Sequence, residues 1–290
     1  MIEFLKQHTC YDVLPISFRL IVFDTDLPVK KALEILVQNG IVSAPLWSSS
    51  THSFAGMLTV SDFISLIQHY YSHQSHQREV EAMRLSHLTD QIKQNYPIHP
   101  MTTLYDAAVL MSSTRAHRIP LMDSNKEIVS VMTQYRLMKF IANNFQQTEL
   151  LNIPLSRLNI GVYGEAVATA TMQTPVIDVI ALFANLNISA VPIVDDQGTV
   201  FNMYDTIDVM SLVRSEKYGD LDLPVGEALK SRPKNFPGVC TCTMDDTLLS
   251  IFKTIKKKRV YRLAVIEPAT FKLVGLLSIS DVLGYLVKAN

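Results

Sequence analysis

The sequence predicts a mixed α/β fold made of four related repeats that pair two by two. A first marker is a short apolar run that passes through polar residues to a charged residue. The four charged residues are Asp62, Arg136, Asp208 and Asp281. They lie 74, 72 and 73 residues apart. A second marker is centred on Pro45, Pro120, Pro192 and Ala264, which lie 17, 16, 16 and 17 residues before those positions. Two markers that keep their register four times indicate an internal repeat.

Each repeat predicts the same order of elements: an extended segment, a helix, a strand, a turn, a strand and a second helix. Apolar residues recur at helical spacing before the second marker, for example over 29–37 and 176–183. The two markers follow as strands, and the later strand runs into the closing helix. A unit of roughly 60 residues buries too little apolar surface to be stable alone, so we expect the repeats to pair.

Length and composition narrow the class of protein. A chain of 290 residues suggests two domains, which fits two pairs of repeats. The chain is 48% hydrophobic and 18% charged, so it can build sizeable cores. Its 26 basic and 27 acidic residues give a net charge of -1. Nothing global therefore attracts nucleic acid or an anionic membrane.

Several kinds of site and segment have no signature in the sequence. There is no apolar run of the length a membrane span needs and no signal-peptide charge layout, so we expect a cytoplasmic protein, with the nucleus as a second location. The sequence contains no glycine-rich phosphate loop, no nucleophile elbow and no complete metal-ligand set. We therefore expect no metal and no catalytic residues.

The remaining candidates describe a nucleotide-binding module without catalysis. Asp281 is predicted in the first turn of a helix, where its carboxylate can accept hydrogen bonds from neighbouring ribose hydroxyls. Arg118 and Arg262 start equivalent strands and suit phosphate. Arg232 leaves two alternatives open, namely a phosphate contact or a salt-bridged surface residue.

Four segments ending in forms of Gly-h-h-Ser/Thr-x-x-Asp, where h is apolar, resemble cystathionine-beta-synthase (CBS) repeats, which pair into Bateman modules. The flanking sequences are similar to the gamma subunits of AMP-activated protein kinase, particularly the fungal form, over essentially the whole chain. The segments that carry this resemblance are Tyr11–Pro15, Ile41–Trp47, Thr133–Arg136 and Val225–Leu229.

The resemblance implies a domain organisation and a set of partners. It divides the chain into Bateman modules at 1–148 and 149–290, with repeats at 12–72, 90–145, 152–214 and 222–288, and it implies a flat pseudo-symmetric disc. It also implies a non-catalytic subunit that binds AMP, ADP or ATP competitively and that assembles with the alpha and beta subunits of a heterotrimeric Ser/Thr kinase.

The resemblance also implies the residues of a nucleotide site. Asp281 would bind the ribose, with Ser278 and Ser280 beside it. The residues implied around base and ribose are Val162, Ala168, Ile188, Ser189 and Ala190. The residues implied to face the phosphates are His117, Arg118 and Arg262.

A second site implied by the resemblance would use Asp208, with Arg232 and Arg262 toward phosphate and Val239 near the base. Three positions depart from the animal members, which place basic residues where this chain has Tyr261, Val42 and Tyr135. Arg136 replaces the acidic residue of the second repeat outright. These departures leave an alternative function, a CBS-repeat structural scaffold of a kinase complex with little or no nucleotide binding.

Overall fold

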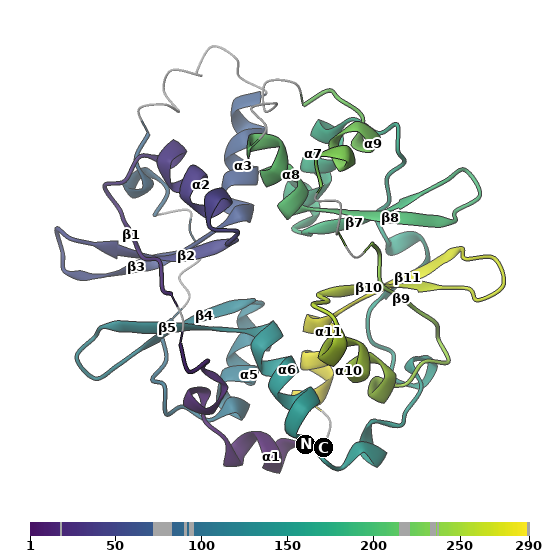
Figure 1. The fold of residues 1–290 in the computed structure, drawn as a ribbon, viewed down its shortest axis with the longest axis horizontal. Helices are drawn as coiled ribbons and strands as arrows, with labels where there is room; N and C mark the ends of the chain where they lie inside the picture. Colours follow the sequence, from purple (N-terminus) through teal and green to yellow (C-terminus); the bar gives the residue numbers. More distant parts are fainter. Residues whose placement is uncertain are drawn as a thin grey trace. The chain divides into compact units, whose positions relative to one another are not determined.

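The computed structural model describes residues 1–17, 19–71, 83–89, 92, 96–214, 221–232, 236 and 238–288. They form two compact units, which we call the first and the second unit (Figure 1). The first unit comprises Met1–Leu20, Asn95–Val167 and Val239–Asn290, and the second comprises Ile21–Gln94 and Ala168–Gly238. Each unit thus combines alternate repeats, the second with the fourth and the first with the third. The predicted modules 1–148 and 149–290 stay a prediction.

The first unit holds two hairpins and the helices that pack on them. Its helices are α1 (Ile2–Gln7), α5 (Leu104–Thr114), α6 (Gln134–Asn144), α10 (Leu248–Lys257) and α11 (Ile279–Lys288), with short 3-10 turns η1 (Cys10–Val13), η4 (Thr148–Leu151), η5 (Leu155–Arg157) and η6 (Gly164–Ala166). Its strands are β4 (Arg118–Met122), β5 (Ile128–Thr133), β6 (Val162–Tyr163), β9 (Thr241–Cys242), β10 (Arg262–Ile266) and β11 (Leu273–Ser278). β4 pairs with β5, and the other strands form one sheet in the order β6-β11-β10-β9.

The second unit has the same organisation. Its helices are α2 (Val29–Gln38), α3 (Val60–Tyr71), α7 (Val176–Leu186), α8 (Thr206–Arg214) and α9 (Val225–Ala228), with 3-10 turns η3 (Leu85–His87) and η7 (Leu229–Ser231). Its strands are β1 (Phe23–Asp24), β2 (Ser43–Ser48), β3 (Ser53–Thr59), β7 (Ala190–Val194) and β8 (Val200–Asp205). The sheets are β1-β2-β3 and β7-β8. Helix α3 packs against α7 and α8 of the other repeat in this unit (Figure 1).

The predicted order of elements is confirmed. The two marker segments form the two strands of an antiparallel hairpin in every repeat, with Pro45, Pro120, Pro192 and Ala264 in the first strand of each. The apolar spacing before the first strand corresponds to helices α2, α5, α7 and α10. The spacing of apolar residues is enough to predict these elements, because the strands and the helices each bury one apolar face.

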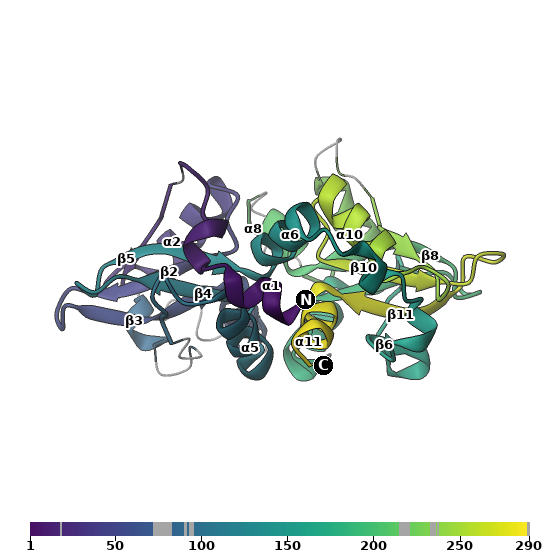
Figure 2. The same cartoon turned by 90° about the horizontal axis from the view of Figure 1, so that it is seen from below.

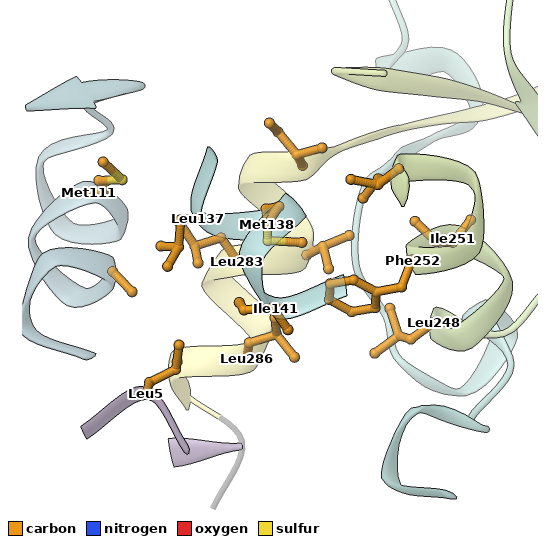
Figure 3. Packing of buried hydrophobic residues seen from close by; sticks show 14 of the residues in the cluster. Leu5, Met111, Leu137, Met138, Ile141, Leu248, Ile251, Phe252, Leu283 and Leu286 are labelled. Atoms are coloured by element: carbon orange, nitrogen blue, oxygen red, sulfur yellow. The ribbon is translucent and has the colours of Figure 1, made fainter. Parts of the chain in front are cut away.

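The core of the first unit is built where helices of the second and fourth repeats meet. Helix α6 packs on α10 and α11, and α11 packs on α5 (Figure 2). The side chains between them are apolar and fully or almost fully buried, and Figure 3 shows them pointing toward one another. Among them are Leu137, Ile141, Phe252, Leu283 and Leu286. Neither repeat's helices would cover this apolar surface alone, which is why the repeats pair.

A glycine allows the short strand β6 to join the sheet beside β11. Gly275 pairs with Tyr163, and Leu276 pairs with Val162. A Cβ on Gly275 would lie 2.3 Å from Cδ1 of the Tyr163 ring and 2.7 Å from the Val162 carbonyl oxygen. The Tyr163 ring therefore occupies the space that any other side chain at position 275 would need.

We expect Gly275→Ala to destabilise the first unit by about 1–3 kcal/mol, the usual cost of overpacking. The matched control is Gly284→Ala on α11, where a Cβ would make an ordinary contact at 3.5 Å with Ser112 Oγ. Alanine at that helical position should be neutral or stabilising by up to about 1 kcal/mol. Urea unfolding of the two variants measures both effects, and equal stability of the two would contradict the packing at Gly275.

Candidate functional site

The fourth repeat places Asp281 in the first turn of α11, where it closes a capping box with Ser278. The backbone N–H and the hydroxyl of Ser278 donate to Asp281 Oδ2 at 2.8 and 2.7 Å, and the Asp281 N–H contacts Ser278 Oγ at 3.2 Å. Such a reciprocal pair satisfies donors at a helix start. Asp281 Oδ1 accepts no hydrogen bond from the described residues. The half-buried carboxylate therefore keeps one oxygen available to a ligand.

The corresponding residues of the other repeats show that the acidic position first serves the helix. Asp62 accepts from the Thr59 N–H and hydroxyl at 2.6 and 2.8 Å, and Asp208 accepts from the Asp205 N–H at 2.8 Å. Arg136 cannot accept, and its guanidinium instead donates to the Val131 carbonyl at 2.9 Å. The second repeat thus has no ribose acceptor at this position, as its sequence predicts.

A backbone hydrogen bond joins the two sequence markers in each repeat. The first residue of the closing helix donates its N–H to the carbonyl of the residue just before the first hairpin strand. The four bonds are Val60 to Val42 at 3.0 Å, Gln134 to His117 at 3.0 Å, Thr206 to Ser189 at 3.1 Å and Ile279 to Tyr261 at 3.0 Å. In every repeat the residue before the first hairpin strand therefore lies beside the start of the closing helix.

In the first unit a polar contact links the second and fourth repeats. Ser280 Oγ donates to Gln134 Oε1 at 2.7 Å and lies 3.3 Å from His117 Nδ1. His117 Nδ1 also lies 3.2 Å from Gln134 Oε1. Two predicted site residues from different repeats, His117 and Ser280, are thereby brought together one residue from Asp281.

The equivalent contact on the other side of this unit is aromatic. Tyr261 corresponds to His117 in the repeat, and Tyr135 corresponds to Ser280. Their ring centroids are 5.5 Å apart. Arg259 donates to the Tyr261 hydroxyl at 2.7 Å and stacks over both rings. The unit thus has a polar contact beside Asp281 and an aromatic contact beside Arg136.

This placement changes the expected effect of Tyr261. By the resemblance, Tyr261 stands where animal members have a basic residue, which makes the phosphate contacts of those members less transferable to either predicted site of this chain. In the structure its hydroxyl accepts from Arg259 and its ring meets Tyr135, the neighbour of Arg136. Tyr261 therefore belongs to the side of the unit whose ribose acceptor is already missing.

The two predicted phosphate arginines begin equivalent strands. Arg118 opens β4 opposite Thr133, and Arg262 opens β10 opposite Ser278, so each faces the helix cap of its own repeat. Burial lowers the pKa of Arg118; nearby Tyr261 opposes this shift, and the charge of Arg259 adds to it. Arginine nevertheless stays protonated in proteins.

The remaining residues of the predicted Asp281 site lie in two places. Val162 is on β6, beside Leu276 of the strand that leads to Ser278, and 44% of the residue is exposed. The other four belong to the second unit: Ala168 and Ile188 pack against its core, Ala190 is buried, and the Ser189 carbonyl accepts the Thr206 N–H. Their place around a ligand of Asp281 stays a prediction.

The predicted second site has its charged groups bound to each other. Arg232 Nε donates to Asp208 Oδ1 and its Nη2 donates to Oδ2, both at 2.5 Å. Only 8% of the Arg232 side chain and 5% of the Asp208 side chain are exposed. Arg232 also donates to Asn202 Oδ1 at 2.7 Å and stacks on Phe236. Of the two alternatives for Arg232, the structure shows a salt bridge, but a buried one.

This ion pair leaves neither member open to a nucleotide. Both carboxylate oxygens of Asp208 accept from the guanidinium, and Oδ2 also accepts from the Asp205 N–H. Val239, predicted near the base of that site, belongs to the first unit. A ligand at Asp208 would first have to break a buried bidentate pair, which is strongly unfavourable.

Two residues that sequence reasoning did not assign to the site lie beside it. Gln134 bridges His117 and Ser280, and Tyr163 packs over Gly275 on the strand that leads to Ser278. Arg259, which binds Tyr261, belongs to the aromatic side of the unit. A comparison of the four repeats marks Gln134 as unusual in the sequence, because the equivalent positions are occupied by Val60, Thr206 and Ile279. An amide at a position that is apolar in two other repeats suggests a specific partner.

The described residues show neither a metal-binding cluster nor a membrane-spanning helix. Within these ranges no group of three or more His, Cys, Asp or Glu side chains is placed to hold a metal ion. The helices in the same ranges are each too short or too polar to cross a membrane.

We expect Arg232→Met to destabilise the protein by about 3–5 kcal/mol, because it leaves the Asp208 charge buried without a partner. The double variant Arg232→Met, Asp208→Leu should recover most of this loss. Lys230→Ala is the control: it breaks an exposed pair with Glu227 at 2.6 Å and should cost less than about 1 kcal/mol. Chemical denaturation measures all three, and a small effect of Arg232→Met alone would contradict the buried pair.

Comparison with known proteins identifies the relatives of this chain. The model of the CBS domain matches residues 12–69, 91–143, 163–215 and 234–288. The 5'-AMP-activated protein kinase subunit gamma of Saccharomyces cerevisiae is 44% identical, with 98% of this chain and 92% of that protein covered. The subunit of the same name from Kluyveromyces lactis is 46% identical, with 99% and 91% covered.

One solved structure supports the fold over the whole chain. A Methanocaldococcus jannaschii protein, described as an archaeal homologue of the kinase gamma subunit, superimposes with a TM-score of 0.76. The match covers 96% of this chain and 99% of that one. At 13% identity it supports the architecture alone.

Proposed function

This chain belongs to the CBS-domain family of gamma subunits of AMP-activated protein kinase, and we propose that it is a non-catalytic regulatory subunit that senses adenine nucleotides. AMP, ADP and ATP would compete for the site at Asp281. The partners would be the catalytic alpha and scaffolding beta subunits of a heterotrimeric Ser/Thr kinase, in the cytoplasm and the nucleus. The kinship with the yeast gamma subunits supports this proposal.

The observation that carries the choice of site is the unpaired oxygen of Asp281. The carboxylate is held in place through Oδ2 by Ser278, while Oδ1 points to no donor among the described residues. An oriented carboxylate oxygen with no partner is what a ribose hydroxyl needs. The equivalent positions of the second and third repeats offer none, because one is Arg136 and the other is Asp208 in its ion pair.

The phosphate end of the ligand would meet His117, Arg118 and Arg262. His117 lies within 3.3 Å of Ser280, and Ser280 is the neighbour of Asp281. AMP, ADP and ATP share their nucleoside and differ in phosphate charge alone. A ligand shifts a kinase equilibrium only by its differential affinity for the two states, so discrimination must arise at these basic residues.

The alternative function, a structural scaffold that binds little nucleotide, has one supporting observation. Two of the four equivalent residues make structural contacts. The Arg136 guanidinium donates to a carbonyl of the preceding strand, and Asp208 forms an ion pair with Arg232. This observation limits the number of sites and leaves the geometry at Asp281 unaffected. We therefore propose one adenylate site as the principal one.

We expect Asp281→Ala to weaken AMP and ATP binding by about 1–3 kcal/mol, the cost of removing a hydrogen-bonding partner. Isothermal titration calorimetry of the purified chain with AMP, ATP and GTP is the measurement. Absence of AMP and ATP binding to the wild-type chain would support the scaffold, and a preference for GTP would contradict an adenylate site.

Asp281 also caps α11, so a control for capping is needed. Asp106→Ala removes a comparable pair at the start of α5, where the Thr103 hydroxyl contacts Asp106 at 2.7 Å. It should cost similar stability and leave adenylate affinity unchanged. An equal loss of affinity in both variants would mean that capping, and not ribose contact, explains the effect of Asp281.

A further inference from the structure

Helix α2 of the first repeat ends in a Schellman motif that contains an Asn-Gly pair. Asn39 caps the helix, and Gly40 follows it in the left-handed conformation with a φ of 60°. The Gly40 N–H donates to the Val37 carbonyl at 3.2 Å, and the Ile41 N–H donates to the Leu36 carbonyl at 3.0 Å. These two bonds define the motif, and its left-handed position favours glycine. The end of the helix therefore explains why a glycine follows Asn39.

This pair occurs once in the sequence, and it is exposed. Every other asparagine with a following residue precedes a residue that has a side chain. Asn39 and Gly40 are both exposed. Apart from the adjoining residues, no described atom lies within 4 Å of the place that a Cβ on Gly40 would take. Water therefore reaches the peptide bond between the two residues.

An asparagine followed by glycine can lose its side-chain amide. The backbone nitrogen of Gly40 attacks Cγ of Asn39 and closes a five-membered succinimide ring. The side-chain nitrogen takes up the proton of the Gly40 N–H and leaves as ammonia. Water then opens the ring at either of its carbonyls, which gives aspartate or isoaspartate at position 39. Glycine favours ring closure, because no side chain obstructs the approach of its nitrogen.

The folded conformation keeps the reacting groups apart. The ψ angle of Asn39 is 0°, which turns the Gly40 nitrogen away from the asparagine side chain. The side chain is also held, because its Nδ2 donates to the Ile35 carbonyl at 2.8 Å. This bond and the bond from Gly40 to Val37 must both break before the ring can close. The opening is local, because Val37 and Ile41 on either side pack against the core of the second unit.

We propose that Asn39 is a deamidation site and that the Schellman motif controls the rate of its reaction with water. The motif supplies the glycine that makes the pair reactive. Its hydrogen bonds hold the pair in an unreactive conformation, so the reaction proceeds from molecules in which the end of α2 is open. Such local opening costs much less free energy than unfolding of the whole chain.

The modification changes the first repeat in two ways. A carboxylate at position 39 cannot donate to the Ile35 carbonyl, and the helix dipole disfavours a negative charge at this end of α2. Isoaspartate also lengthens the backbone by one carbon atom between α2 and β2. The residue just before β2 is Val42, whose carbonyl accepts the Val60 N–H at 3.0 Å. We therefore expect the modified chain to have a less stable second unit.

Incubation of the whole folded chain in ¹⁸O-labelled water at mildly alkaline pH tests the site. The water that opens the succinimide leaves its oxygen in the product, so peptide mass spectrometry locates each deamidated residue. Asn187 is the internal control, because it is exposed at the end of α7 and precedes the β-branched Ile188. We expect Asn39 to be labelled at least about tenfold faster than Asn187, a difference of about 1.4 kcal/mol in barrier.

The same measurement in concentrated urea tests the control by the motif. Unfolding removes both protecting hydrogen bonds, so we expect labelling of Asn39 to be about tenfold faster than in the folded chain. Gly40→Ala should slow labelling in urea, where its effect on the helix end plays no part. After long incubation, the wild type should unfold at a lower urea concentration than before, and Asn39→Gln should not change.

Each part of the proposal can fail separately. Labelling of Asn39 no faster than that of Asn187 in the folded chain would overturn the deamidation site. Equal rates at Asn39 in the folded chain and in urea would overturn the control by the Schellman motif. An unchanged urea midpoint of the deamidated chain would overturn the expected loss of stability. These measurements use no nucleotide, so their outcome is independent of the proposed function.

Discussion

The backbone hydrogen bond between the start of each closing helix and the residue before the first hairpin strand determines where functional side chains lie. It occurs once in each repeat, between residues 17 or 18 positions apart in the sequence, for example from the Ile279 N–H to the Tyr261 carbonyl. A helix start has unsatisfied N–H groups, and this carbonyl satisfies one of them. The antiparallel hairpin then aligns Arg262 with Ser278. The capped start of the helix and the start of the strand are thus held next to each other. The candidate site of the first unit lies at this place.

The first unit shows how two related repeats came to differ at one equivalent contact. The residue pair His117 and Ser280 is polar and adjoins the available carboxylate of Asp281. The equivalent pair, Tyr261 and Tyr135, is aromatic and adjoins Arg136. The backbone hydrogen bond beside the contact is the same in both, and the side chains differ. The proposed ligand site lies on the polar side of the unit, and the aromatic contact lies on the other.

Much of the fold could be predicted from the sequence, because it depends on local periodicity. The markers around Pro45 and Asp62 recur in the other three repeats, and they correctly predicted the hairpins and the helices. The sequence also singles out Asp281 over the second repeat, since Arg136 lacks a carboxylate; the role of Asp281 in ligand binding stays a prediction. Periodicity does not predict which residue, far away in the sequence, a given side chain contacts. Ser280 meets Gln134 across 146 residues, and no local pattern marks that contact.

The capping and pairing of the other predicted site residues illustrate the same limit. Ser278 is predicted beside a ribose, and its hydroxyl and N–H hold Asp281 in place, which no local pattern specified. Arg232 was open between phosphate and salt bridge, because a basic residue before a proline suits either. The outcome depended on Asp208 lying in the same unit with low exposure, which is a property of tertiary packing.

The buried pair of Asp208 and Arg232 has a consequence for how this subunit can evolve. The acidic group of Asp208 resembles a ribose-binding residue. A substitution of Arg232 alone would not make it available to a ligand in a stable protein, because the Asp208 charge would then be buried without a partner. Positions 208 and 232 therefore have to change together. A nucleotide site in the third repeat could arise only through a destabilised intermediate protein. The number of binding sites in such a subunit is in this way constrained by its history as well as by its chemistry.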